Sequence, residues 1–158
     1  MKTTPITPPE PKHIFIQVNT DNIIALYESG MSDKDFEDAV LEHTIIYDQG
    51  SMALGSPIVD FAIAVDSVQD VYFTILPLQL FSYDKVYFTA FNVESSAGIH
   101  IPDCKWEPGV LSFNVNTGSV EKDGNLVFKL VARIDYTRRG LAKSITINID
   151  PVMRVRQR

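Results

Sequence analysis

The sequence predicts a mainly β protein, an antiparallel β-sandwich of about seven or eight strands with one short inserted helix. In most segments after residue 57, apolar side chains recur at every second position, which is the period of a strand with one buried face. Polar or glycine-containing turns separate these segments. Because 158 residues suit one domain, we expect residues 13–158 to form a single β-sandwich domain after a disordered or extended tail at residues 1–12.

The N-terminal third contains the tail, one strand and the helix. The tail MKTTPITPPEPK is polar and has four prolines, which favour an extended chain. Residues 13–19 alternate well enough for a strand, and the Asp21 carboxylate can cap a short helical turn after it. Residues 32–43, SDKDFEDAVLEH, are the best helix candidate, because Ser32 is a suitable N-cap and acidic residues crowd the first turns.

The remaining predicted strands are residues 58–65, 70–76, 85–93, 110–116, 126–136 and 143–150. In the fourth of them, Leu111 is expected to point inward together with Phe113 and Val115. Asp123-Gly124 predicts a hairpin turn, because this pair readily supplies the positive φ angle that such a turn needs. The segment TRRG at residues 137–140 predicts a second turn, after which the chain returns antiparallel.

The C-terminal residues SITINIDPVMRVRQR combine a core strand with a basic end. Ile145, Ile147 and Ile149 alternate with polar residues, so we expect them in the core. Three arginines follow at alternate positions, but the neighbouring valines do not keep one parity. We therefore expect the last residues to fray as a solvated edge protected by charge, in preference to a nucleic-acid-binding arm.

The charge distribution limits the choice of partners. The net charge of −6 disfavours nucleic-acid binding, because an acidic surface repels a phosphate backbone. Residues 125–158 carry eight Lys or Arg against two Asp, a net +6, whereas residues 1–124 carry six against eighteen Asp or Glu, a net −12. Either these charges intermix on folding, or the basic end of one copy meets the acidic side of another, which would favour a homo-oligomer.

The sequence contains no recognisable catalytic or cofactor-binding pattern. Cys104 has no second cysteine to pair with, and Pro102 breaks the helical spacing that His100 and Cys104 would need to chelate a metal. The Gly- and Ser-rich residues 50–56 lack the lysine and the following helix of a phosphate loop. We therefore expect no catalytic residues, no metal, no cofactor and no enzymatic activity.

The same sequence bears on localisation. No apolar run of signal-peptide length follows Met1, and no later stretch is long enough to span a bilayer. A lone cysteine is compatible with a reducing compartment. These features predict a cytoplasmic protein without a membrane span.

Aromatic side chains suggest a binding role as an alternative. Trp106 lies among polar residues in DCKWEPG, and many sandwiches hold a sugar between such a ring and nearby polar groups. If a glycan is the partner, we expect Trp106, Asp21 and Tyr83 to bind it. The competing interpretation is that the Trp106 ring covers the open end of the core.

The order of the segments resembles that of a known family. A first strand leads into NTDNII, and DFAIAVDSVQDVYF, YDKVYFTAFNV, LVFKLVARIDY and IDPVMRV follow. The clearest matching positions are Thr20 with Asp21, Asp70, and Asp150-Pro151. On these motifs the chain resembles the bacterial inclusion-body proteins, the PixA/AidA-like family, over most of its length after residue 12. The resemblance implies a β-sandwich that accumulates in bacterial cells, sometimes as cytoplasmic inclusions, and it implies no activity.

Two functions follow as expectations. The first is a non-catalytic, self-associating β-sandwich protein of the inclusion-body type, for which the separated charges provide a mechanism of assembly. The alternative is a carbohydrate-binding, lectin-like module that uses exposed aromatic and amide side chains.

Overall fold

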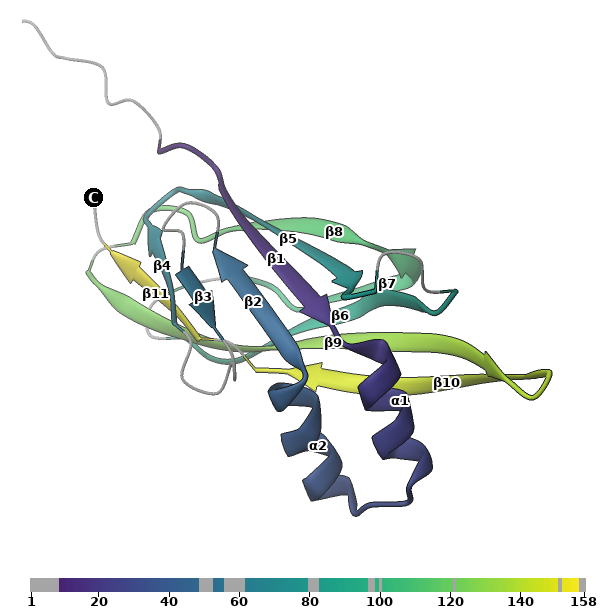
Figure 1. Cartoon of the computed structure of the whole chain (residues 1–158). Coiled ribbons are helices and arrows are strands. Elements are labelled where there is room, and N and C mark those ends of the chain that lie inside the picture. Colours follow the sequence, from purple (N-terminus) through teal and green to yellow (C-terminus); the bar gives the residue numbers. More distant parts are fainter. Residues whose placement is uncertain are drawn as a thin grey trace, which may run out of the picture.

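The computed structural model describes residues 9–48, 53–55, 62–79, 83–96, 99, 101–120, 122–150 and 152–156. Its elements, in chain order, are β1 (Lys12–Val18), α1 (Thr20–Glu28), α2 (Asp33–Glu42), β2 (Thr44–Asp48), β3 (Ala53–Gly55), β4 (Ala62–Asp66), β5 (Asp70–Pro77), β6 (Lys85–Ser96), β7 (Cys104–Val110), β8 (Ser112–Asn116), β9 (Gly124–Arg138), β10 (Leu141–Ile149) and β11 (Val152–Arg156). Of the expected tail at residues 1–12, residues 1–8 lie outside the described part of the chain. The two helices project together from the sandwich where β1 ends and β2 begins (Figure 1).

The strands form two sheets, and this confirms the predicted mainly β sandwich. The five-stranded sheet has the order β3-β2-β1-β5-β8, and the six-stranded sheet has the order β4-β11-β9-β6-β7 with β10 also paired to β9. The described part of the chain has eleven strands where about seven or eight were expected. It has two helices where one was expected, and two of its strand pairs, β1–β5 and β4–β11, are parallel.

Both helices begin at a side-chain cap. Ser32 accepts a hydrogen bond from the backbone N–H of Asp35 at 3.2 Å and starts α2, as predicted. The cap of α1 is Asn19, which accepts from the N–H of Asn22 at 3.3 Å, so the prediction that Asp21 caps this helix is wrong. Asp21 lies two residues after this cap, in the first turn of α1, where its charge interacts favourably with the helix N-terminus.

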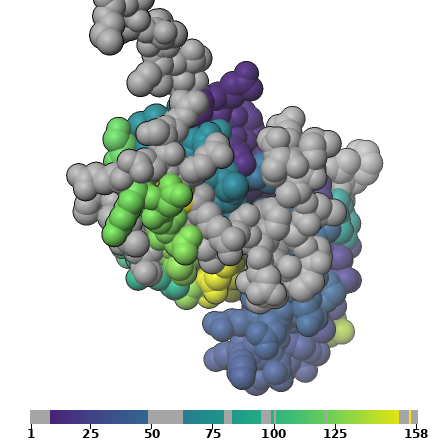
Figure 2. All heavy atoms as spheres, turned by 90° about the vertical axis from the view of Figure 1, so that its left-hand side faces the viewer, coloured from purple at the N-terminus to yellow at the C-terminus, as the bar shows by residue number. Residues whose placement is uncertain are grey.

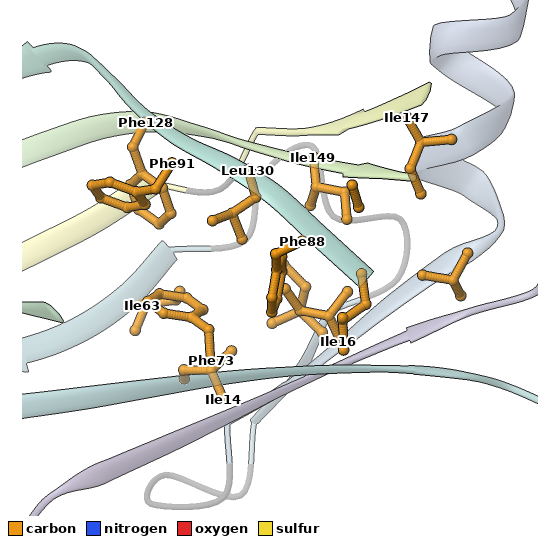
Figure 3. Packing of buried hydrophobic residues seen from close by; sticks show 14 of the residues in the cluster. Ile14, Ile16, Ile63, Phe73, Phe88, Phe91, Phe128, Leu130, Ile147 and Ile149 are labelled. Carbon is orange, nitrogen blue, oxygen red and sulfur yellow. The ribbon is translucent and has the colours of Figure 1, made fainter. Parts of the chain in front are cut away.

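The core lies between the two sheets, as the alternation predicted. Figure 3 shows Ile14, Ile16 and Phe73 of the five-stranded sheet facing Phe88 and Phe128 of the six-stranded sheet. All five side chains are fully buried. Close packing of rings and branched side chains from both sheets therefore excludes water from the centre of the sandwich.

One predicted core residue is exposed because the chain changes sheets there. Leu111 separates β7 of the six-stranded sheet from β8 of the five-stranded sheet, and 56% of its surface is exposed. The inward orientation predicted for Leu111 is therefore wrong, whereas Val115 is buried and Phe113 packs against the core. A crossing residue does not continue the alternation of either strand.

The two predicted hairpin turns had different outcomes. Arg138 pairs with Leu141 across a two-residue turn in which Arg139 and Gly140 have φ angles of 51° and 74°, so the turn within TRRG is confirmed. The turn predicted at Asp123-Gly124 is wrong. Here β8 and β9 belong to different sheets, and Gly124 is already the first residue of β9.

Residues 152–156 form an interior strand, so the prediction of a fraying edge is also wrong for this part of the C-terminus. β11 lies between β4 and β9, parallel to the first and antiparallel to the second. Val155 is buried, as are Ile145, Ile147 and Ile149 of β10. The side chains of Arg154 and Arg156, and all of Arg158, lie outside the described residues.

Candidate functional site

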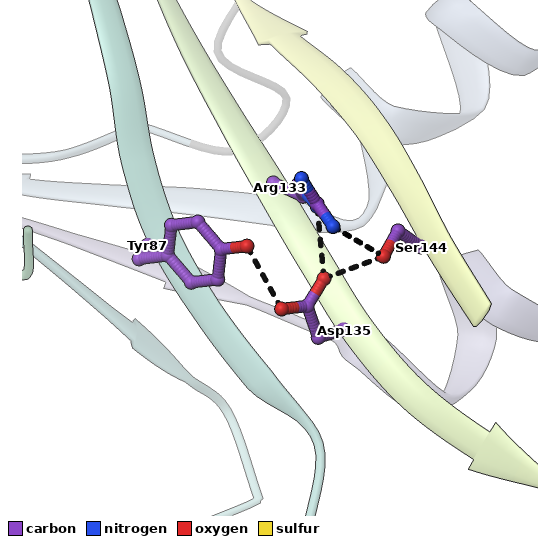
Figure 4. A network of polar contacts seen from close by, with 4 residues as sticks. All are labelled: Tyr87, Arg133, Asp135 and Ser144. Carbon is purple, nitrogen blue, oxygen red and sulfur yellow. Dashed lines mark hydrogen bonds and ion pairs between the residues drawn. The ribbon is translucent and has the colours of Figure 1, made fainter. Parts of the chain in front are cut away.

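A polar network occupies the outer face of the six-stranded sheet. On β9, Ala132 and Ile134 point into the core, so Arg133 and Asp135 point outward. Strand register places Tyr87 of β6 opposite Arg133, and Ser144 of β10 opposite Asp135. Three neighbouring strands thus bring these four side chains together (Figure 4).

The carboxylate of Asp135 is the centre of this network. Its Oδ2 accepts a hydrogen bond from the Tyr87 hydroxyl at 2.8 Å. Its Oδ1 accepts from Arg133 Nε at 2.9 Å and from the Ser144 hydroxyl at 2.7 Å. Arg133 Nη2 also donates to Ser144 Oγ at 2.9 Å. Every member is therefore held by at least one other member, which fixes the orientation of the side chains.

The electrostatics of the network do not favour nucleophilic catalysis. Partial burial acts to raise the pKa of Asp135, but hydrogen bonds from Ser144, Tyr87 and Arg133 outweigh it and leave the pKa below its usual range. A carboxylate with a lowered pKa is a weak general base, and no histidine belongs to the network as described. Ser144 therefore lacks the activating base that a serine nucleophile needs.

A hollow of about 510 Å³ lies beside the network, and we call it the outer-face hollow. Tyr83, Lys85 and Lys143 line it together with Arg133 and Asp135. Lys143 is paired with Glu28 of α1 at 2.9 Å, and Tyr83 is fully exposed. Arg133 is paired with Asp135 and Lys143 with Glu28, so these two cations of the hollow are already matched by carboxylates.

A second cavity, of about 630 Å³, lies where β1 and β9 begin. Its lining includes Lys12, whose ammonium group forms an ion pair with Asp48 of β2 at 2.9 Å. Both side chains are buried, and Asp48 is only 2% exposed. Gln69 also lines this cavity, where its amide donates to the backbone carbonyl of Glu10 at 2.7 Å and accepts from the N–H of Asp66 at 2.9 Å. These bonds fix the orientation of the side chains that line the cavity.

The three residues predicted to bind a ligand lie on different elements. Tyr83 lines the outer-face hollow, but neither Trp106 nor Asp21 is among the residues that line it. Asp21 is exposed in the first turn of α1. The Trp106 ring is partly buried against Phe113 and Phe88, at centroid distances of 4.5 and 6.4 Å. A ligand-binding role for these three residues stays a prediction.

Two features of the sequence together indicate the network around Asp135. The outward positions of β9 alternate with its apolar positions, and the turn at TRRG fixes the register of β10. Together they place Ser144 opposite Asp135. The ion pair between Lys12 and Asp48 had no such signal, because 36 residues separate its partners.

The described residues contain few other side chains that could bind a metal or take part in catalysis. They include no group of three or more His, Cys, Asp and Glu side chains that could hold a metal ion, and His100 lies outside them. Cys104 is a free, partly buried thiol. No helix among these residues is long and apolar enough to cross a membrane.

Comparison with known proteins identifies the fold. The sequence matches no family model and no curated protein. The crystal structure of an inclusion body protein, PixA, from Burkholderia cenocepacia J2315 superimposes with a TM-score of 0.61 at 9% sequence identity. The match covers 99% of this chain and 100% of that one. The fold that the resemblance in the sequence implied is thus confirmed: this chain has the fold of the PixA inclusion body protein over almost its whole length.

Proposed function

We propose that this chain is a non-catalytic, self-associating bacterial β-sandwich protein of the inclusion-body type, which accumulates in the cytoplasm as a homo-oligomer. The observation that carries this proposal is the likeness to the PixA structure, which extends over both sheets and both helices because it covers 99% of the chain. A likeness limited to a few strands would be common among sandwiches and would carry much less weight.

The chemistry of the described residues supports a non-catalytic role. The most connected polar group, Asp135, is bound by three donors and has a lowered pKa, so it is a poor proton acceptor. Its neighbour Ser144 donates its proton to that carboxylate rather than to an imidazole. This arrangement is typical of a network that fixes strand register.

The β7 edge of the six-stranded sheet opposes association of copies by strand addition. β7 is one edge strand of this sheet, and Pro108 within it cannot donate to an incoming strand. Lys105 and Glu107 on the same strand are exposed charges, which also oppose strand addition. Strand addition at β7 is therefore disfavoured. The separated charges of the sequence support contacts between charged side chains as the mode of association.

The test is the mass of the purified protein in solution at two salt concentrations. We expect assemblies at roughly 0.05 M NaCl that dissociate at about 1 M NaCl, because the screening length falls from above 10 Å to about 3 Å over this range. Sedimentation velocity measures both states. A monomer at low salt and millimolar-range protein concentration would contradict the proposal.

A further inference from the structure

The outer face of α2 carries a row of carboxylates. Asp35, Asp38 and Glu42 are spaced three and four residues apart, so they lie along one side of the helix. All three are exposed, whereas Ala39 and Val40 of the same helix are buried. We call these three carboxylates the acidic stripe. Figure 2 shows α2 projecting below the body of the sandwich.

Asp35 lies in the first turn of α2, where the helix dipole favours its charge, but the C-terminal part of the acidic stripe is electrostatically unfavourable in an isolated molecule. Asp38 and Glu42 are four residues apart, and like charges at this spacing repel each other. Glu42 is the last residue of α2, where the helix dipole disfavours negative charge, and the last turn has no basic residue. In the described part of the chain, none of the three forms an ion pair. A cationic surface from outside would relieve this repulsion.

The other helix shows how the chain neutralises such a group internally. Glu28 is the last residue of α1, and its Oε1 accepts from Lys143 Nζ at 2.9 Å and from the Tyr136 hydroxyl at 2.8 Å. Both donors belong to the β9–β10 hairpin. A carboxylate at the end of α1 is therefore matched by a hairpin cation, and the equivalent carboxylate of α2 is not.

The β9–β10 hairpin also carries a cation without an internal partner. At its tip, Arg138 pairs with Asp84 at 3.4 Å, but Arg139 is exposed and forms no ion pair with the described residues. The turn geometry, with a φ of 51° at Arg139, holds this residue at the end of the hairpin. In Figure 1 the tip extends past the sandwich, and α1 stands between it and α2. The two unmatched charged surfaces therefore do not meet within one molecule.

We propose that the acidic stripe of α2 in one copy binds the hairpin tip around Arg139 in the next copy. This inference rests on the proposed function of self-association and names its interface. The two surfaces are different, so the contact is heterologous: each copy that binds through α2 still has a free hairpin tip. Unless the rotation between copies closes a ring, such a contact adds copies without limit. That is the geometry of an inclusion rather than of a closed dimer.

The test uses two charge-reversal variants of the full chain. One is Asp38→Lys/Glu42→Lys, and the other is Arg139→Glu. Each variant alone presents like charges on both surfaces, so we expect its association to weaken at least about tenfold relative to wild type. Mixed in equal amounts, each acidic surface again meets a basic one, and we expect assemblies in which the two variants alternate.

Matched controls change the same net charge elsewhere on the surface. Lys105→Glu is matched to the hairpin variant, and Glu10→Lys/Glu107→Lys to the helix variant; all three control positions are exposed. We expect both controls to assemble like wild type. Circular dichroism melts confirm that every protein is folded, and sedimentation velocity reports its mass at low salt.

The outcomes separate this inference from the proposed function. If wild type assembles and both reversal variants assemble equally well, the interface lies elsewhere, and only the inference is overturned. Two monomeric variants that stay monomeric when mixed also overturn it. A wild-type protein that stops at a symmetric dimer overturns the heterologous contact. If wild type itself is monomeric, the proposed function fails.

Discussion

Lys12 and Asp48 form a buried ion pair on neighbouring strands of the five-stranded sheet. Their side-chain atoms lie 2.9 Å apart and are 10% and 2% exposed, respectively. Removing one member of such a pair leaves a desolvated charge without its closest partner, which costs far more than breaking a surface ion pair. At the residue scale, this pair therefore ties the first strand of the domain to β2.

The corresponding prediction concerns Lys12→Met. Its methionine fills similar space without the ammonium group, so we expect the free energy of unfolding to fall by about 3 kcal/mol. Urea denaturation at neutral pH measures the change. The double variant Lys12→Met/Asp48→Asn should recover part of the loss, because the uncompensated carboxylate is gone. Equal stability of the single variant and wild type would contradict a strong pair.

At the scale of elements, the Tyr136 hydroxyl joins the β9–β10 hairpin to α1 through its hydrogen bond to Glu28. Burial first, and then the hydrogen bond to Glu28, raise the pKa of Tyr136 to about 12. The pKa of Glu28 is held below its usual range by hydrogen bonds from Lys143 and Tyr136. These contacts connect residues more than a hundred positions apart and fix the helix against the sheet.

The sign of the resulting pH dependence follows from the Tyr136 pKa. In the unfolded chain a tyrosine ionises near about 10, so between about 10 and about 12 only the folded state keeps this proton. The stabilisation from Tyr136 is therefore complete below about pH 10 and is lost as pH rises toward 12. We expect Tyr136→Phe to lower stability at pH 7 by about 1 kcal/mol. It should also flatten the decline of stability above pH 10.

Urea unfolding at several pH values, together with the ultraviolet absorbance of tyrosinate, measures both effects. Tyr83→Phe is the matched control, because Tyr83 is fully exposed and should leave both measurements unchanged. A Tyr136→Phe protein with the same alkaline profile as wild type would show that another group controls this range.

Elements whose evidence is local could be predicted from the sequence. Alternation identified β1, β5, β6, β9 and β10, and residues 137–140 were recognised as a turn because a two-residue hairpin is a local structure. Of the candidate site, only Tyr83 was named in advance. The network around Asp135 depends on register among three strands, and single-sequence patterns specify register only where a turn is recognised.

Elements that depend on distant partners could not be predicted. β11 is parallel to β4, and about ninety residues separate the paired positions, so no local pattern reports this pairing. Asp123-Gly124 has the composition of a hairpin turn but lies where the chain passes from one sheet to the other. The choice between these alternatives is made by packing of the whole sandwich, which local propensity does not contain.

At the scale of the molecule, an aromatic cluster closes one side of the sandwich. Trp106 of β7 packs on Phe113 of β8, and these strands belong to opposite sheets. Phe113 in turn contacts Phe73 of its own sheet and Phe88 of the other, at centroid distances of 5.2 and 4.9 Å. The cluster thus holds the two sheets together through packing of aromatic side chains from both.

We therefore expect Trp106→Ala to destabilise the whole domain. The indole is partly buried, so the loss should be near the lower end for aromatic deletions, about 3 kcal/mol. Trp106→Phe is the control and should lose less than half as much, because a ring still packs on Phe113. Thermal unfolding followed by circular dichroism measures both variants. An unchanged melting temperature in Trp106→Ala would mean that this side of the sandwich is closed by other residues.

The interior position of β11 has a consequence during synthesis. β4 and residues 124–127 of β9 have no neighbour on their facing sides until residues 152–156 have left the ribosome, although β4 has been made some ninety residues earlier. Throughout that interval a growing chain offers the open edge of β4, and toward its end also the start of β9, to other chains on the same messenger RNA. Crowded translation is then a period in which this protein is exposed to unwanted strand exchange.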